Sequence, residues 1–150
     1  MNQTDFQSSY NQSQSKTQFS VELLGPGGLY SLYGSYRFNQ NVAGNIGLGL
    51  YPAFYNRNME VLSGFQIPMS FSYLFFGDSD HHLEMNGGIN LGLLVNIDTG
   101  EFSKYGSLVG GFGYRYWPNE GGFHFRTMFY SFWVPTGLGL SAGISFGIAI

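Results

Sequence analysis

The last thirteen residues of the chain alternate strictly between two kinds of side chain. The even-numbered positions from Leu138 to Ile150 are apolar, and the odd-numbered positions between them are glycine, serine or alanine. A period of two residues indicates a β-strand whose two faces meet different surroundings. The segment is longer than a typical globular strand and suits the roughly 9–11 residues with which a tilted strand crosses a bilayer. It therefore predicts a membrane-spanning strand.

The composition supports a membrane protein. Charged residues make up 10% of the chain, against about 25% in an ordinary soluble domain, and aromatic residues reach 19%. The mean hydropathy of -0.05 agrees with this, because lipid-facing and lumen-facing residues alternate in a membrane barrel and their contributions cancel. No window approaches 18 consecutive apolar residues, which excludes a transmembrane helix and leaves a closed barrel.

Several other classes of protein are excluded or unsupported. A length of 150 residues suits one domain, and the absence of cysteine excludes disulfides and thiolate chemistry. With a net charge of -3 and six lysines and arginines, the chain has no basic stripe for nucleic acid.

Residues 1–18 lack the apolar core of a signal peptide, so we interpret Met1 as an expression start on an already processed chain.

The alternation defines two parts of the chain. Residues 1–18 are rich in glutamine, serine and asparagine and are expected to form a flexible polar arm. From Phe19 the alternation recurs, so residues 19–150 are expected to form an all-β fold, an eight-stranded antiparallel up-and-down transmembrane β-barrel. The expected strands are residues 18–24, 29–38, 42–51, 65–76, 82–95, 107–117, 123–133 and 138–150.

Turn residues set the register of neighbouring strands. Pro68 cannot donate to a β-ladder and is expected at a bulge or a frayed strand end. Longer links are expected at 55–64 and 96–106, whereas the turns after the second, fourth and sixth strands are short. Outer-membrane barrels place short turns in the periplasm, so both termini are expected to be periplasmic. The expected pairs across five short turns are Leu24 with Leu29, Phe38 with Val42, Phe76 with His82, Trp117 with His124, and Phe132 with Gly139.

The chain resembles the eight-stranded outer-membrane barrels of Gram-negative bacteria, the class of the OmpA transmembrane domain and OmpX. Within residues 19–150, the segments ELLGPGGLYSLYGSYRF (22–38), HHLEMNGGINLG (81–92) and GGFGYRYWPNEGGFHFR (110–126) are similar to uncharacterised small barrel proteins of Bacteroidota-type outer membranes. The resemblance implies the architecture and a bacterial outer-membrane location, and it brings no catalytic motif. The chain departs from many such barrels, which end on an aromatic residue, because Phe146 is followed by GIAI.

The inward-facing positions contain an unusual set of charged and titratable residues. Because the interior of an eight-stranded barrel is only wide enough for side chains, these residues are expected to pair with one another. Arg115 and Arg126 fall directly opposite in the expected register and repel, so they need a carboxylate, for which Glu84 is the first choice. We expect a polar plug that fills the lumen; a proton or ligand site is the alternative. The expected lumen charge network is Glu22, Arg37, Glu84, Arg115, His124 and Arg126.

Outward-facing aromatic residues gather near both ends of the expected strands. Aromatic girdles at the two membrane interfaces are typical of outer-membrane barrels. A soluble lipocalin-type barrel would instead place its apolar residues inside. The expected girdles are Tyr30 and Trp133 at the outer rim, and Phe38, Phe75, Tyr116 and Phe123 at the inner rim.

Two possible chemical sites have simpler alternative interpretations. His81 and His82, preceded by Asp78 and Asp80, suggest a metal site, but adjacent strand residues point to opposite faces, which favours a solvated periplasmic turn. A lipid acyl hydrolase or transferase would need a nucleophile and an orienting acid beside a base such as His124, and no outward serine lies next to it.

The sequence thus favours a non-enzymatic outer-membrane barrel with a plugged lumen. We expect it to act as a structural or interaction component, with a subunit of a larger outer-membrane complex as one option. Its partners would be outer-membrane lipid and such a complex, with no cofactor and no metal. A lipid-modifying enzyme is the second hypothesis and a small-solute channel the third.

Overall fold

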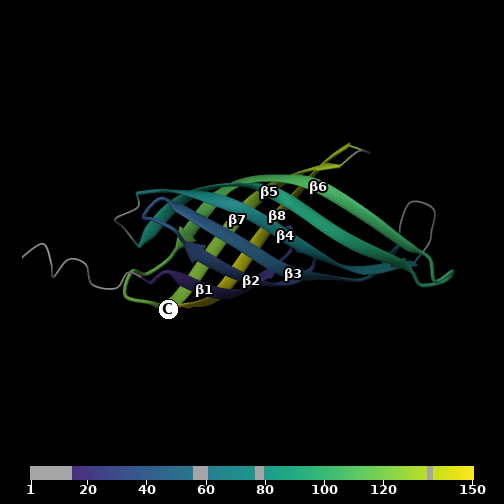
Figure 1. Ribbon diagram of the computed structural model, residues 1–150, viewed down its shortest axis with the longest axis horizontal. Helices are drawn as coiled ribbons and strands as arrows, with labels where there is room; N and C mark the ends of the chain where they lie inside the picture. The colour runs from purple at the N-terminus through teal and green to yellow at the C-terminus, as the bar shows by residue number, and fades with distance from the viewer. Residues whose placement is uncertain (1–14, 56–60, 77–79, 135–136) are drawn as a thin grey trace, which may run out of the picture.

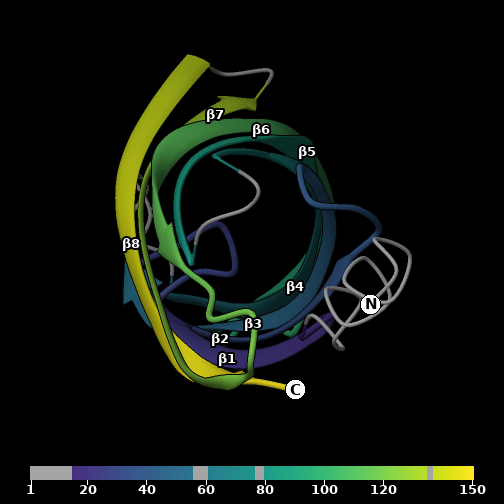
Figure 2. The same cartoon turned by 90° about the vertical axis from the view of Figure 1, so that its left-hand side faces the viewer.

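The computed structural model describes residues 15–55, 61–76, 80–134 and 137–150. Each strand pairs with the next in an antiparallel ladder, and β8 pairs with β1, so the sheet closes on itself (Figures 1 and 2). The expected all-β, eight-stranded antiparallel barrel is confirmed. The strands are β1 (Thr17–Leu23), β2 (Tyr30–Arg37), β3 (Val42–Tyr55), β4 (Val61–Phe75), β5 (His81–Asn96), β6 (Phe102–Tyr116), β7 (Gly122–Val134) and β8 (Gly137–Ala149).

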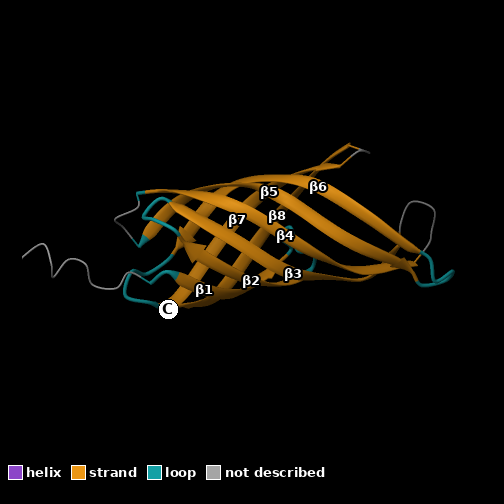
Figure 3. Ribbon diagram, viewed as in Figure 1, coloured by secondary structure: helices purple, strands orange, loops and turns teal. Residues whose placement is uncertain are grey.

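Strands and turns account for the described part of the chain (Figure 3). In these residues no helix is long and apolar enough to cross a membrane.

The two faces of the barrel wall differ as the alternation predicts. In β1, Phe19, Val21 and Leu23 are exposed on the outside, whereas Ser20 and Glu22 are buried inside. The same pattern runs along β2 and most of β5. The outer face is therefore apolar, and the interior holds most of the buried polar and charged side chains.

The register agrees with all five pairs expected from the turns. Leu24 donates its backbone N–H to Leu29 at 3.2 Å, and Phe38 donates to Val42 at 2.9 Å. The ladders between β4 and β5, β6 and β7, and β7 and β8 have the expected register too. Each pair keeps inward residues opposite inward residues, since a slip by one residue would reverse a whole strand.

The two long links expected from the sequence are wrong, because the strands beside them continue further. β3 runs to Tyr55, β4 starts at Val61 and β6 starts at Phe102. The turn between β5 and β6 is compact, since the Asn96 side-chain oxygen accepts the N–H of Asp98 at 2.9 Å and of Thr99 at 3.2 Å. Link length therefore does not orient the barrel.

Pro68 occupies a regular position rather than a bulge. It lies opposite Asn90 in an uninterrupted ladder with β5, and the ladder with β3 has the same register on either side of it. The irregularity in that ladder lies instead between Tyr51 and Phe54. Proline lacks a backbone N–H, so Pro68 removes one hydrogen-bond donor from the ladder. A bulge would instead add an extra residue to the strand and shift the register.

Both ends of the described chain lie at one end of the barrel, where Gln18 of β1 pairs with Ala149 of β8. We call this end the terminal end and the opposite one the far end. β1 starts at Thr17, one residue before the expected first strand, so the end of the expected arm belongs to the barrel; residues 1–14 lie outside the described residues. β1 and β2 are the shortest strands, and β3 to β6 extend beyond them at the far end (Figure 1).

The register between β1 and β8 predicts which pair of introduced cysteines can form a disulfide. Val21 and Phe146 are directly opposite, and paired residues in a sheet lie within the Cα separation that a disulfide spans. The double variant Val21→Cys, Phe146→Cys is expected to oxidise to an internal disulfide, identified by mass spectrometry of the digested protein. The chain has no native cysteine to compete. The offset pair Val21→Cys, Ile148→Cys should stay reduced, and equal oxidation of both pairs would contradict this register.

Candidate functional site

The barrel interior holds one carboxylate between two arginines. Arg115 on β6 and Arg126 on β7 are directly opposite one another, and Glu84 projects from the adjacent strand β5. One Glu84 oxygen lies 2.8 Å from Arg115 Nε, and the other lies 2.8 Å from Arg126 Nη2. Ser72 donates a further hydrogen bond to Glu84. All of these side chains are buried, so the carboxylate offsets the repulsion between the two guanidinium groups.

A second carboxylate reaches Arg126 from β1, the strand that closes the barrel against β8. It belongs to Glu22. Its Oε1 lies 3.3 Å from Arg126 Nη1 and accepts the Tyr130 hydroxyl at 2.8 Å. Arg126 also donates to the Tyr130 oxygen at 2.8 Å. Gly143 leaves room here, because a Cβ at that position would lie 3.1 Å from Glu22 Oε1 and 3.0 Å from the Tyr130 ring. A side chain at this position of β8 would thus crowd both partners of the contact.

Amides and hydroxyls connect this cluster to the opposite wall. Arg115 Nη2 donates to the Asn45 side-chain oxygen at 3.1 Å, and Ser35 donates to the same oxygen at 2.8 Å. The Asn45 amide in turn donates to Ser72 Oγ at 2.8 Å. The charged centre is therefore held from β2, β3 and β4 as well as from β5 to β7.

At the terminal end the interior is occupied by Trp117. The Arg37 guanidinium lies 4.4 Å from the centroid of its ring and that of Arg115 lies 5.2 Å from it, which are cation–π distances. The Trp117 indole N–H donates to Ser15 at 3.1 Å. Arg37 Nη1 also donates to the Asn119 side-chain oxygen at 2.9 Å. The residue that follows β6 thus turns inward and covers the lumen at this end.

His124 lies beside this group and is fully buried. Its Nδ1 is 2.7 Å from the Gln18 amide nitrogen, and its ring meets Trp117 edge-on at 6.4 Å. Amide-to-imidazole contact at this distance is a hydrogen bond in which Gln18 donates and the imidazole accepts.

At the far end the turn between β1 and β2 folds into the lumen. Residues 25–28 are buried, and the Asn90 amide donates to the Pro26 carbonyl at 2.7 Å from across the barrel. A Cβ at Gly49 would lie only 1.7 Å from the Gly27 carbonyl oxygen, so the turn fits only against a glycine. Gly28 has φ +97°, a left-handed conformation that glycine adopts without strain.

The six lumen residues named from the sequence fall into two adjoining groups. Arg115 bridges them, with Glu84 on one side and the Trp117 ring on the other. Glu22, Glu84 and Arg126 belong to the central group, whereas Arg37 and His124 surround Trp117 and form no ion pair with either glutamate among the described contacts. The network expected from the sequence does not include Tyr130 and Trp117. Both occupy inward-facing positions in the alternation of their strands, which was the signal that could have identified them.

The His81–His82 pair divides between the two faces of the wall. His81 is exposed, with Nδ1 2.5 Å from the Tyr114 hydroxyl, and His82 is buried inside. The inward position of His82 agrees with the expected strand 82–95, and β5 starts one residue earlier, at His81. Asp80 accepts the Asn119 backbone N–H at 2.7 Å; Asp78 lies outside the described residues. In residues 15–55, 61–76, 80–134 and 137–150, no three histidine or acidic side chains gather as a metal site would require.

The aromatic residues named as girdles lie on the outer face. Tyr30 and Trp133 lie toward the far end, at the start of β2 and near the end of β7. The other four belong to the terminal end, and the Tyr116 ring is 5.1 Å from that of His81. These four are Phe38, Phe75, Tyr116 and Phe123.

The shared carboxylate predicts a large loss of stability in Glu84→Gln. Removing one partner of a buried ion pair leaves the others uncompensated and costs about 3–5 kcal/mol. We expect the free energy of unfolding, measured by urea titration in phospholipid vesicles, to fall by about that amount. Glu101→Gln, in the exposed turn after β5, is the matched control and should change it by less than about 0.5 kcal/mol. Equal effects of the two variants would contradict the assignment.

No protein-family model matches the sequence, and no curated protein sequence matches it. Solved structures do resemble the fold. The N-terminal β-barrel domain of Pseudomonas aeruginosa OprF matches with a TM-score of 0.69 and 16% identity, covering 93% of this chain and all of that one. Ail, the attachment invasion locus protein of Yersinia pestis, solved with the heparin analogue sucrose octasulfate, matches with a TM-score of 0.51 and 12% identity, covering 89% and 94%. The expected likeness to small outer-membrane β-barrels is thus confirmed for the fold.

Proposed function

We propose that the chain is a bacterial outer-membrane barrel with a closed lumen, which acts as a non-enzymatic interaction component. OprF and Ail are both outer-membrane barrels, and the apolar outer face of this chain suits lipid. The observation that carries the proposal is the placement of Glu84 between Arg115 and Arg126 inside the wall. Because a buried charge is tolerated only when it is paired, this mutual pairing supports an interior filled by side chains rather than by water.

Three layers of side chains and backbone support a lumen closed to solutes. The buried turn at residues 25–28 lies at the far end, Trp117 with Arg37 lies at the terminal end, and the Glu84 cluster adjoins Trp117 through Arg115. An eight-stranded barrel leaves little space beyond such side chains, whereas aqueous pores need about 16 strands. Conduction by this chain is therefore the weaker hypothesis.

The terminal end is proposed to face the periplasm. The support is the uneven strand length, because β3 to β6 extend beyond the shorter β1 and β2 at the far end (Figure 1). Outer-membrane barrels characteristically have short periplasmic turns and longer extracellular extensions. Both termini would then be periplasmic.

A catalytic role for His124 has little support. The imidazole is fully buried inside the wall and accepts a hydrogen bond from Gln18, so a lipid ester outside the barrel has no path to it. A hydrolase would also need a nucleophile within hydrogen-bond reach of the base, and no serine or threonine is hydrogen-bonded to His124 in the described part of the chain.

A free strand edge supports an interaction role. β1 pairs with β8 only from Ile144 to Ala149, so residues 137–143 of β8 have no strand partner on that side among the described residues. Ile150 exchanges both backbone hydrogen bonds with Thr17, so by alternation Leu138, Leu140 and Ala142 point their N–H and C=O groups to the free side. Unpaired backbone groups are strongly disfavoured in lipid. An extended segment of a partner protein would satisfy them.

The closed lumen predicts no conductance. The folded chain reconstituted in a planar bilayer is expected to show no steady single-channel current, with a general porin inserted under the same conditions as the positive control. Insertion is checked by the mobility difference between boiled and unboiled protein in gels. Steady, reproducible current steps from the pure, inserted chain would overturn the closed-lumen proposal.

The free edge predicts which substitution disrupts a complex. Leu140→Pro removes an N–H that the barrel itself does not use, so the barrel should fold while an added strand is blocked. Co-purification with a larger barrel from outer membranes in mild detergent is expected to be lost in Leu140→Pro. Leu140→Ala keeps the N–H and should retain more of the partner. A partner that is captured equally by wild type and Leu140→Pro would contradict docking at this edge.

A further inference from the structure

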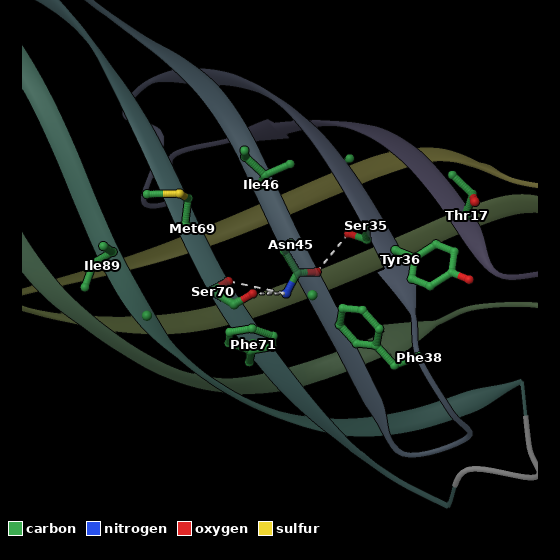
Figure 4. Close-up of a pocket in the computed structure, with 13 residues that line it drawn as sticks. Thr17, Ser35, Tyr36, Phe38, Asn45, Ile46, Met69, Ser70, Phe71 and Ile89 are labelled. Carbon is green, nitrogen blue, oxygen red and sulfur yellow. Dashed lines mark hydrogen bonds between the residues drawn. The ribbon is translucent and has the colours of Figure 1, made fainter.

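The inward-facing side chains of the barrel change in character at the far end. Elsewhere in the wall, the inward Asn45 side chain accepts a hydrogen bond from Ser35 at 2.8 Å and donates one to Ser70 at 3.3 Å (Figure 4). Ile46 and Phe71, the next residues along β3 and β4, stand on the outer face. Inward positions here are therefore polar and paired with one another.

At the far end, three apolar side chains occupy inward positions without being covered. Leu29, Tyr51 and Phe132 share the face of the buried inward residues next to them in the alternation, yet each is only half-buried. By contrast, Leu74 and Met128, which also point inward, are fully buried. Uncovered apolar surface gains free energy when a further apolar group covers it.

These three side chains line a pocket of about 360 Å³ beside the inward-folded turn, which we call the far-end pocket. Leu24 and Ser141 complete its side-chain lining, and Gly25 and Gly28 of the turn contribute backbone. No charged side chain is among the described residues that line it. Because ligand pockets in proteins span about 300–1,000 Å³, this one suits a small molecule.

Contacts with the turn hold the pocket in shape. Ser141 donates its hydroxyl to the Leu24 carbonyl at 2.5 Å, which joins β8 to the start of the turn. A Cβ at Gly28 would lie 3.1 Å from the Tyr51 ring, so this ring packs on the turn backbone. Leu24 has φ +62°, a left-handed conformation in which a bulky residue is strained. Strain of this kind gathers at ligand-binding sites, where the surrounding structure enforces it.

The far-end pocket is distinct from the free edge of β8. That edge offers the backbone groups of Leu138, Leu140 and Ala142, whereas the pocket uses the inward side chain of Ser141. It is also distinct from the apolar outer face, because Tyr51 and Phe132 point toward the lumen. Its occupant is therefore neither an added strand nor a group that contacts the outside of the wall.

We propose that the far-end pocket binds a small, neutral, largely apolar molecule. Two aromatic rings and two leucines supply van der Waals contacts to such a ligand. A charged ligand would lose its hydration without gaining an ionic partner. This binding activity goes beyond the proposed function and does not require a partner at the β8 edge.

The test titrates indole, a neutral aromatic probe, into the full chain in phosphatidylcholine nanodiscs and follows the leucine methyl signals by NMR. The signals of Leu24 and Leu29 are expected to shift and to saturate. Those of Leu32 and Leu48, on the outer face, should at most drift linearly, as partition of indole into the bilayer would cause. Indoleacetate, which carries a carboxylate, should produce no saturating shift at the same concentrations.

A matched pair of variants locates the probe. Leu29→Trp fills the far-end pocket and is expected to weaken indole binding several-fold. Leu32→Trp adds the same side chain on the outer face, where Leu32 is 62% exposed, and should leave the affinity unchanged. The mobility difference between boiled and unboiled protein in gels shows whether each variant folds, and the wild-type titration can contradict the proposal without either of them.

Three results would overturn the proposal. Linear shifts at every leucine would mean partition into lipid alone. Saturating shifts that persist unchanged in a folded Leu29→Trp variant would place indole elsewhere. Equal binding of indoleacetate would contradict a neutral ligand. Each of these results concerns the far-end pocket only, since steady current through the inserted chain is the separate result that would overturn the closed lumen.

Discussion

Arg115 and Arg126 share the Glu84 carboxylate inside a closed wall, and the arrangement of the interior follows from this contact. Three strands in succession contribute one residue each, so the pairing exists only in the register that β5, β6 and β7 adopt. A slip of one residue in any of them would place a charge on the apolar outer face or leave one unpaired in the lumen. The ion cluster and the register therefore depend on each other.

The remaining interior residues extend this cluster toward both ends. Tyr130 connects Arg126 to Glu22, and Trp117 receives Arg37 and Arg115 on its ring. Glycines make the space for these bulky groups, most clearly at Gly49, which faces the inward-folded turn. Glycine placement thus determines what can fill the barrel.

The sequence predicted the faces of the strands well and their ends less well. Alternation at period two is a property of each strand, so it identified β8 and the inward positions of Glu84, Arg115 and Arg126. Strand ends depend on pairing with a neighbour, which explains why β6 starts at Phe102 rather than near residue 107. The inward turn at residues 25–28 was also missed, because glycines and a proline predict a turn without indicating its direction. Its position depends on Gly49, distant in sequence.

The two tryptophans provide the most direct test of which side of the wall meets lipid. Trp133 is 69% exposed on the outer face, and Trp117 is fully buried in the lumen. Single-tryptophan variants, Trp117→Phe and Trp133→Phe, reconstituted in vesicles with brominated acyl chains, allow each indole to be measured separately by fluorescence quenching. The account predicts strong quenching of Trp133 and little of Trp117. Quenching of Trp117 with protection of Trp133, or a chain that stays in the aqueous phase, would contradict it.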